Sequence, residues 1–477
     1  MDSVWTLSCE MKRRNSLDYD LETEVAIIGG GLAGILTAFK LKEKGIDSVI
    51  LESSKTANGQ TKNTTAKITS QHGLIYADLI KNFGLEKARQ FADANQKAIA
   101  EYKRIIEENN IDCDFEALPA YLYSTSETET LIKEDEAARK LGLPSSFTTT
   151  VALPFPVRGA VRFEGQAQYN PLKFIKAISD SFTIFENTQV KSVEDNLIKT
   201  VSNTVKAKHI VFATHYPFIN VPGYYFLRLH QERSYVIALK NAQQLDGMYY
   251  SMDEKGYSFR NYGELLLLGG ENHRTGENST GGRYNSLRRA AKQIYPQSQE
   301  TACWSAQDCI TMDYVPYIGQ YSAGTPNWYV ATGFCKWGMT SSMVSAMIIS
   351  DMITGIENPY AEVFSPQRFN MASVPNALKD TGQAIKGLVL KRVTVAKAIL
   401  YELPIGHGGI VDTEEGTAGV YKDEQGRTYT VSPTCPHLGC RLEWNPDEKS
   451  WDCPCHGSRF DYKGYLLDNP AQTDISE

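Results

Sequence analysis

Short, uniformly apolar segments alternate with segments of helical period in the first part of the chain. Residues 24–28 form an apolar run typical of a buried strand, and residues 35–45 have the helical period and end on a glycine. Residues 48–51 form a second apolar run. The order strand, helix, strand predicts a βαβ unit in which the two strands lie parallel.

The same pattern continues along the chain and predicts a large α/β fold. Helices are expected over residues 79–109 and 339–356. Strands are expected within 182–198 and over 209–213, 235–239, 264–268 and 328–332.

The pattern changes twice towards the C-terminus. Prolines interrupt residues 356–375, and we place a linker at 361–391 with a helix over 378–390. From residue 392 to residue 477, short apolar segments alternate with turns that contain glycine. This last region is expected to be a small all-β domain.

Composition and charge exclude several classes of protein. Hydrophobic residues make up 42% of the 477 residues, and the net charge of −7 offers no basic surface for nucleic acid. The N-terminus lacks the apolar segment of a secretory signal, and the most apolar helical segment, 343–353, is shorter than the ~20 residues that span a bilayer. We expect a cytoplasmic protein that is not transmembrane and keeps most thiols reduced.

A glycine-rich sequence follows the first predicted strand directly. Gly29, Gly31 and Gly34 have the spacing GxGxxG, and Glu52 ends the second strand. Such glycines allow a tight turn, close approach of a pyrophosphate to the helix N-terminus, and close packing of helix on strand. Glu52 is placed to accept hydrogen bonds from a ribose. This context favours a Rossmann-type dinucleotide site over a glycine-rich turn in an unrelated fold.

Further segments have the features of one group of flavoproteins. They are 25–34 with Glu52, the polar stretch 59–67, and the segments 211–215, 313–319 and 331–340. Because of these segments, residues 24–360 resemble the D-amino-acid-oxidase-like FAD-dependent oxidoreductases. The resemblance implies a Rossmann-like α/β FAD-binding domain with an α+β substrate domain. Within a unit spanning 1–360, it places the FAD-binding parts at about 20–75, 155–225 and 300–360 and the substrate parts at about 76–154 and 226–299.

The resemblance also implies which residues bind FAD. In the family the polar stretch lines the flavin, and the last segment brings a helix N-terminus to the flavin ring. Cys309 does not match the position at which some members attach the cofactor, so noncovalent FAD is expected. The expected FAD-binding residues are Gly29, Gly31, Leu32, Ala33, Gly34, Glu52, Ser53, Thr64, Thr65, Ala66, Lys67, Val190, Thr214, Gly333, Gly338, Met339 and Thr340.

Four of the nine cysteines lie close together near the C-terminus. Cys435 and His437 form one box and Cys453 and His456 a second, and each box has one further cysteine. Structural zinc sites favour about two to four residues between paired cysteines, a spacing that these boxes do not share. The spacing by itself leaves zinc or a disulfide knot as alternatives.

The two boxes are similar to those of Rieske [2Fe–2S] domains. The resemblance implies that one iron is held by Cys435 and Cys453 and the other by His437 and His456. It also implies a disulfide between the two remaining cysteines, Cys440 and Cys455. With segments 64–67, 70–73 and 304–308, the chain is similar to FAD-dependent oxidoreductases that carry a C-terminal Rieske domain.

The combination leads to one main hypothesis and two alternatives. The main hypothesis is an enzyme that oxidises an amine or amino-acid-like small molecule by hydride transfer to FAD. Electrons then pass singly to the [2Fe–2S] cluster and on to an external acceptor, either a protein or a quinone. One alternative is a non-catalytic relay between partner proteins. A ring hydroxylase is less favoured, because the other histidines show no pattern of two histidines and one carboxylate for a second iron.

Few residues stand out as candidates for the substrate pocket. Arg233 is expected to bind a substrate carboxylate through two hydrogen bonds. Each candidate also has an ordinary interpretation as a surface or packing residue. The candidates are His72, Arg233, Tyr235, His273, Lys336 and Trp337.

Overall fold

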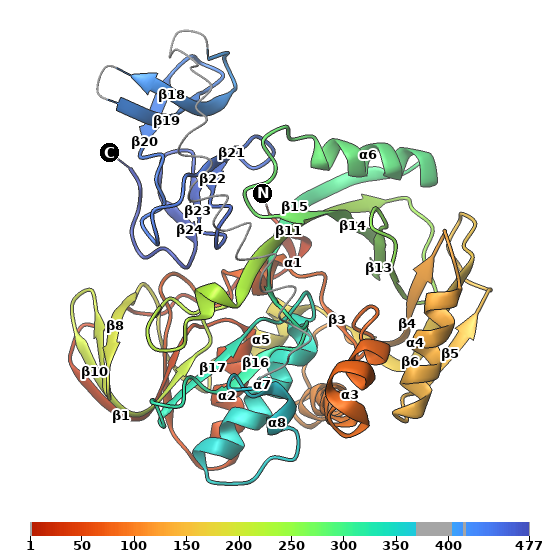
Figure 1. The fold of residues 1–477 in the computed structure, drawn as a ribbon, viewed down its shortest axis with the longest axis horizontal. Coiled ribbons are helices and arrows are strands. Elements are labelled where there is room, and N and C mark those ends of the chain that lie inside the picture. Colours follow the sequence, from red (N-terminus) through yellow and green to blue (C-terminus); the bar gives the residue numbers. More distant parts are fainter. Residues whose placement is uncertain (1, 369–402, 414–415, 477) are drawn as a thin grey trace.

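The computed structural model describes residues 2–368, 403–413 and 416–476. Two large sheets and two small ones carry the fold (Figure 1). The predicted helix over 378–390 lies outside the described residues, as does most of the predicted linker. The described part of that linker includes the short helix α8 (Ala361–Phe364).

The first large sheet is the predicted Rossmann-like unit. Its order is β16-β17-β10-β1-β2-β7, with β9 beside β10 and β8 beside β9. Val25 and Ile27 of β1 point into one hydrophobic cluster, and Ala26 and Ile28 into another. Burial on both faces explains why these strands are uniformly apolar. The strands are β1 (Leu21–Ile28), β2 (Ser48–Leu51), β7 (Thr183–Phe185), β8 (Val190–Glu194), β9 (Leu197–Thr200), β10 (Thr204–Phe212), β16 (Tyr317–Gln320) and β17 (Trp328–Thr332).

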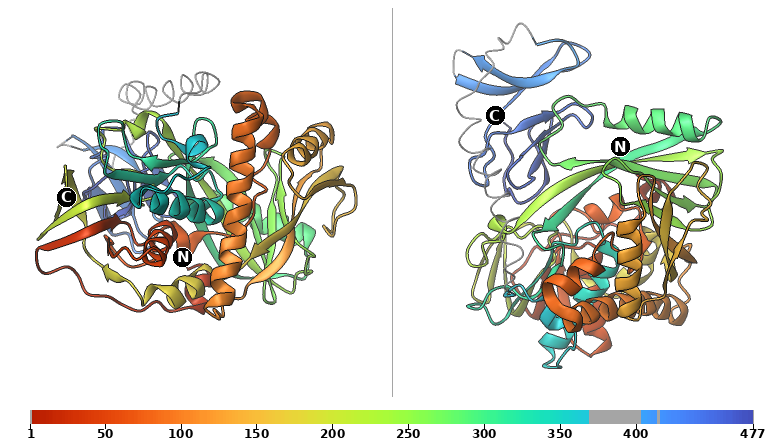
Figure 2. Two further views of the ribbon diagram at one scale, coloured as in Figure 1. Left: turned by 90° about the horizontal axis from the view of Figure 1, so that it is seen from below. Right: turned by 45° about the vertical axis from the view of Figure 1, so that its right-hand side comes forward.

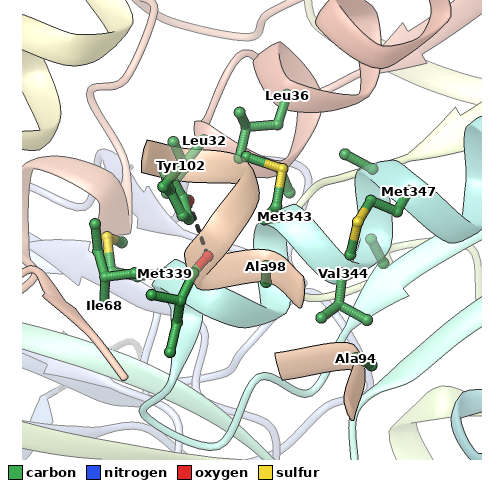
Figure 3. Close-up of a cluster of buried hydrophobic side chains, with 14 of the residues drawn as sticks. Leu32, Leu36, Ile68, Ala94, Ala98, Tyr102, Met339, Met343, Val344 and Met347 are labelled. Atoms are coloured by element: carbon green, nitrogen blue, oxygen red, sulfur yellow. Dashed lines mark hydrogen bonds between the residues drawn. The ribbon is translucent and has the colours of Figure 1, made fainter. Parts of the chain in front are cut away.

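Three helices share one hydrophobic core beside this sheet (Figure 3). Leu36, Ala98 and Met343 lie in it, and the Tyr102 hydroxyl donates a hydrogen bond to the Met339 carbonyl at 2.9 Å. This packing fixes the first turns of two helices that begin at the site described below. The three helices are α2 (Leu32–Glu43), α3 (Tyr76–Glu108) and α7 (Gly338–Ile353).

The second large sheet has the order β15-β11-β14-β13-β12-β4-β6-β3, with β5 beside β6. Helix α6 (Arg283–Ile294) packs on one of its faces, against Tyr235 and Ile237 (Figure 1). The strands are β3 (Lys67–Ile68), β4 (Glu116–Ser124), β5 (Ser145–Thr148), β6 (Gly159–Gln168), β11 (Leu229–Lys240), β12 (Met248–Ser251), β13 (Ser258–Tyr262), β14 (Leu265–Arg274) and β15 (Gln299–Thr311).

This sheet corrects the predicted division of the oxidoreductase unit. Strands β3, β6 and β15 fall in the predicted FAD-binding parts, yet they pair within the second sheet. β6 pairs with β4, and β15 pairs with β11, both of which lie in the predicted substrate parts. Segments distant in sequence therefore build one sheet, a pairing that local patterns do not encode.

The remaining helical elements are short. They are α1 (Val4–Ser8), α4 (Glu129–Lys140), α5 (Pro171–Ser179) and the 3-10 turns η1 (Gln60–Asn63) and η2 (Tyr225–Leu227). Among the residues described, no helix combines the length and apolar character needed to cross a membrane.

The C-terminal region forms two small antiparallel sheets, which confirms the predicted all-β domain. The sheet β21–β24 lies between the sheet β18–β20 and the rest of the molecule (Figure 1, Figure 2). The strands are β18 (Gly408–Thr413), β19 (Gly416–Lys422), β20 (Thr428–Val431), β21 (Glu443–Asn445), β22 (Ser450–Asp452), β23 (Arg459–Asp461) and β24 (Leu466–Asp468).

Candidate functional site

A cavity of about 990 Å³ lies between the ends of the parallel strands and the second sheet. Most residues predicted to bind FAD line this first cavity: Gly29, Gly31, Leu32, Ala33, Glu52, Ser53, Thr64, Thr65, Lys67, Val190, Thr214, Gly338 and Met339. Gly34, Ala66, Gly333 and Thr340 are not among its lining residues.

Two glycines of the fingerprint are required by close contacts. A Cβ on Gly34 would lie 2.0 Å from the carbonyl oxygen of Gly29. A Cβ on Gly29 would lie 2.4 Å from the carbonyl oxygen of Ala213, and the φ of Gly29 is +110°. The close approach of α2 to β1 therefore depends on the absence of side chains.

Glu52 ends β2 and lies beside the glycine turn. Its carboxylate accepts hydrogen bonds from the backbone N–H groups of Gly30 at 2.7 Å and Ser54 at 2.8 Å. Burial raises the pKa of Glu52, and these hydrogen bonds oppose the shift. The carboxylate is therefore fixed at the edge of the cavity, where a ribose is expected.

The polar stretch 64–67 is held in place by hydrogen bonds to its backbone. The Trp5 indole donates to the Thr64 carbonyl at 2.7 Å, and the Arg260 guanidinium donates to the Ala66 carbonyl at 2.8 Å. Burial, reinforced by the Arg260 charge, lowers the pKa of Lys67 to about 7. Neither Trp5 nor Arg260 was predicted, because only the fold brings them to this segment.

A second cavity, of about 420 Å³, adjoins the first. Tyr250, Lys336 and Trp337 line both cavities, and His72 lines the second. The His72 ring stacks on Trp337, with ring centroids 4.9 Å apart. Burial lowers the pKa of His72 to about 3, so its imidazole is neutral. Three of the predicted pocket residues, His72, Lys336 and Trp337, thus lie together.

Three charged side chains meet where the two cavities adjoin. Lys336 Nζ lies 2.9 Å from Glu232 Oε2, and Glu232 of β11 pairs in register with Asp308 of β15. Asp308 lines the first cavity, and burial raises its pKa to about 6. Neither Glu232 nor Asp308 was predicted as a site residue, although Asp308 lies in segment 304–308, because no motif shows which alternate residues of a strand face a cavity.

The prediction that Arg233 binds a substrate carboxylate is wrong. Side chains alternate between the faces of a strand, and Arg233 lies on the face opposite to Glu232. Its guanidinium is buried and lies 2.5 Å from the carboxylate of Glu448 in the C-terminal domain. Arg233 lines neither of the two cavities. It joins the two domains instead.

Tyr235 and His273 are also directed away from the predicted pocket. Tyr235 contributes to the wall of the first cavity, but its ring packs against Tyr284 of α6 at 4.9 Å between centroids. Its hydroxyl lies 3.1 Å from Nε2 of His273. Both side chains occupy the face that carries α6, which corrects their expected place in the pocket.

We predict that Glu448→Gln destabilises the protein at neutral pH by about 3–5 kcal/mol, because it leaves the Arg233 charge buried and unpaired. Burial opposes ionisation of Glu448, but Arg233 and Arg459 outweigh it and lower its pKa to about 2. The carboxylate therefore contributes stability above its unfolded pKa of about 4.3, and this is lost as pH falls towards 2.

Thermal unfolding of the variants at several pH values measures this effect. Arg233→Met combined with Glu448→Met should lose much less stability than Glu448→Gln, because no unpaired charge remains. Equal losses in the two variants would contradict the assignment.

The two Cys/His boxes come together in a second site. Cys435 and Cys453 are buried free thiols. The rings of His437 and His456 lie 4.9 Å apart, and among the described residues neither buried Nδ1 has a hydrogen-bond partner. Burial lowers the pKa of His437 to about 4 and that of His456 to about 3. Two thiols and two neutral imidazoles with unpartnered nitrogens fit a [2Fe–2S] cluster of mixed ligation.

The loops that carry these ligands are fastened together. Cys440 and Cys455 form a disulfide, as the resemblance to Rieske domains implies. The Cys435 N–H donates to the Cys440 carbonyl at 2.8 Å. The Ser458 hydroxyl accepts a hydrogen bond from the Ala471 N–H at 3.0 Å, which ties the second loop to the C-terminal segment.

The C-terminal segment also closes one side of the first cavity. Residues 466–469 and 471–474 are part of the cavity wall. Lys191 Nζ donates to the Gln472 carbonyl at 3.0 Å, and Gln60 Nε2 donates to Asp468 at 2.9 Å. Both domains therefore build this wall, an arrangement that the separate sequence motifs did not predict.

Family comparisons agree with both sites. Residues 24–352 match the FAD dependent oxidoreductase family, DAO, and residues 401–477 match the Rieske [2Fe-2S] domain. The chain therefore belongs to the DAO family of FAD-dependent oxidoreductases and carries a C-terminal Rieske domain. It is an oxidoreductase whose cofactors are FAD and a [2Fe–2S] cluster.

One relative matches over nearly the whole length of the chain. The chain is 36% identical over 488 residues to the Rieske 2Fe-2S iron-sulfur protein YhfW of Bacillus subtilis (strain 168), covering 98% of this chain and 96% of that protein. Two solved structures share the fold of the oxidoreductase unit. Glycine oxidase from Geobacillus kaustophilus has a TM-score of 0.63 at 18% identity, over 73% of this chain and 99% of its own. L-proline dehydrogenase from P. horikoshii has a TM-score of 0.62 at 17% identity, over 73% of this chain and 98% of its own.

Proposed function

We propose that the protein oxidises an amine or amino-acid-like small molecule by hydride transfer to FAD. Electrons then pass one at a time to the Rieske cluster and on to an external acceptor, a protein or a quinone. Solved structures that share the fold include a glycine oxidase and an L-proline dehydrogenase, which supports a substrate with a carbon next to nitrogen.

The second cavity carries this proposal. It has a volume of about 420 Å³, which suits a small molecule. It shares part of its wall with the first cavity, which we call the FAD cavity because most residues predicted to bind FAD line it. A relay that only exchanges electrons with protein partners has no need of such a space. The cavity therefore favours the enzyme over the relay.

The residues around the two cavities have distinct roles in the proposal. When bound, FAD supplies the hydride acceptor and the cluster a one-electron acceptor. Trp337 and Tyr250 form aromatic walls, and neutral His72 supports Trp337 by stacking. We propose that the Asp308 carboxylate accepts a proton from the ammonium group of the substrate. The substrate must lose this proton before its neutral amine gives up a hydride.

Asp308→Asn is expected to slow flavin reduction by about 10²-fold at neutral pH. Burial raises the pKa of Asp308 to about 6, so the carboxylate is present above this pH and is protonated below it. In the parent protein, flavin reduction should therefore decline as pH falls through 6, and the variant should lack this dependence. Stopped-flow absorbance measures both rates, with exposed Asp18→Asn as the control.

We further propose that FAD is held without a covalent bond. The thiols of Cys309 and Cys335 are buried, and Cys335 donates to the Gly333 carbonyl at 3.1 Å. Acid precipitation should leave all the flavin in the supernatant. Flavin that stays with the precipitate would contradict this.

Anaerobic addition of a panel of amines and amino acids tests the proposed function. A substrate should bleach the flavin absorbance, and the EPR signal of a reduced Rieske cluster should follow. If a reducing partner protein bleaches the flavin while the whole panel fails, the relay is correct instead.

A further inference from the structure

Two buried glutamines connect the second cluster loop with the wall of the FAD cavity. Gln231 belongs to β11 and Gln307 to its neighbour β15. Both side chains are buried, and Gln307 Nε2 donates to Gln231 Oε1 at 2.6 Å. Gln231 belongs to no motif identified in the sequence, and Gln307 lies in segment 304–308 but was not among the predicted site residues.

On the cluster side, the pair holds the loop by its backbone. Gln231 Nε2 donates to the carbonyl of His456 at 2.7 Å, and Gln307 Nε2 donates to the carbonyl of Gly457 at 2.9 Å. A Cβ on Gly457 would lie 2.6 Å from the Cβ of Gln231. The loop that carries one histidine ligand is therefore packed directly on the glutamines.

The side-chain N–H donors of both glutamines all have hydrogen-bond acceptors. Gln231 Nε2 also donates to the Asn469 carbonyl at 3.1 Å, so each amide NH₂ group has two acceptors. Gln307 Oε1 accepts from Thr275 and Arg233, both at 3.3 Å. A buried glutamine pair whose amide donors are all satisfied resists displacement, because a shift would leave polar groups unpaired.

On the FAD side, the same residues reach the cavity. Gln307 is part of its wall, and its N–H donates to Gln60 Oε1 at 2.7 Å. His215 also lines the cavity. Asn469 of the C-terminal domain donates to the Thr214 carbonyl at 3.0 Å. One layer of side chains thus separates the His456 loop from the cavity.

We propose that Gln231 and Gln307 are positioning residues that hold the His456 loop against the FAD cavity and so set the rate of electron transfer between the two cofactors. The inference rests on the proposed transfer of electrons to the cluster. Each transfer oxidises the flavin by one electron and reduces one ferric ion of the cluster, and the external acceptor then restores the ferric ion. The cluster is expected to work from this fixed position.

Flash photolysis with 5-deazariboflavin tests the proposal on the full-length protein loaded with both cofactors, without a substrate. The flash reduces the flavin, and the later reduction of the cluster is followed by absorbance. Gln231→Met with Gln307→Met should slow this second phase by roughly ten- to a hundredfold, because small misplacements of reacting groups have large effects on rate. Exposed Gln243→Met is the matched control and should transfer at the parent rate.

Further readouts separate positioning from damage to the cofactors. The double variant should retain the parent flavin content, cluster EPR spectrum and cluster potential. Gln307→Glu keeps the shape of the side chain but removes both donors, and it should also slow the transfer. Transfer at the parent rate in both variants would overturn the role of the glutamines. No transfer in the parent protein itself would instead overturn the proposed function.

Discussion

Cys453→Ser is expected to abolish the [2Fe–2S] cluster. Cys453 is a buried thiol in the second box, and a thiolate ligand cannot be supplied by another free cysteine of that loop, because Cys455 is in the disulfide. Iron analysis should fall from about two ions per chain to none, and the EPR signal of the reduced cluster should disappear.

A matched variant separates loss of a ligand from loss of any thiol. Cys9 is a half-buried free cysteine near the N-terminus, far from the boxes in sequence. Cys9→Ser should retain iron and the EPR signal in full. A Cys453→Ser protein that kept a Rieske spectrum would contradict the ligand assignment.

Gly34→Val is expected to abolish FAD binding. Even the first carbon of the new side chain would lie 2.0 Å from the Gly29 carbonyl oxygen, so α2 must move away from the glycine turn. That movement would displace the helix N-terminus at which the pyrophosphate is expected. The purified variant should show no flavin absorbance, and added FAD should not raise its unfolding temperature.

Gly324→Ala is the control for this variant. A Cβ at Gly324 would meet nothing within 4 Å. The control should bind FAD as the parent does. Retention of FAD by Gly34→Val would show that the fingerprint does not form the cofactor site.

The parts of the molecule that the sequence predicted well are local. Strands β2 and β17 begin and end where their apolar runs do, and α2 follows the glycine turn as expected. The Cys/His boxes likewise place their predicted ligands in two short stretches, and the structure brings these side chains together.

The predictions that were wrong concern which face of a strand meets which partner. The apolar run at 235–239 indicated a strand but covered only part of β11. A shift of one residue along a strand changes the face, so Glu232 reaches the second cavity while Arg233 reaches Glu448. The sequence pattern around Arg233 contains nothing that specifies a partner more than 200 residues away.

The sequence by itself determined the two cofactor motifs and the classes of domain that contain them, because glycine spacing and ligand spacing act over a few residues. Only the tertiary structure decided how the two sites meet. Residues 466–469 and 471–474 of the Rieske domain line the first cavity, and the two buried glutamines contact the cluster loop. These contacts depend on strand register and domain packing, which arise from many weak interactions between distant segments rather than from any local pattern.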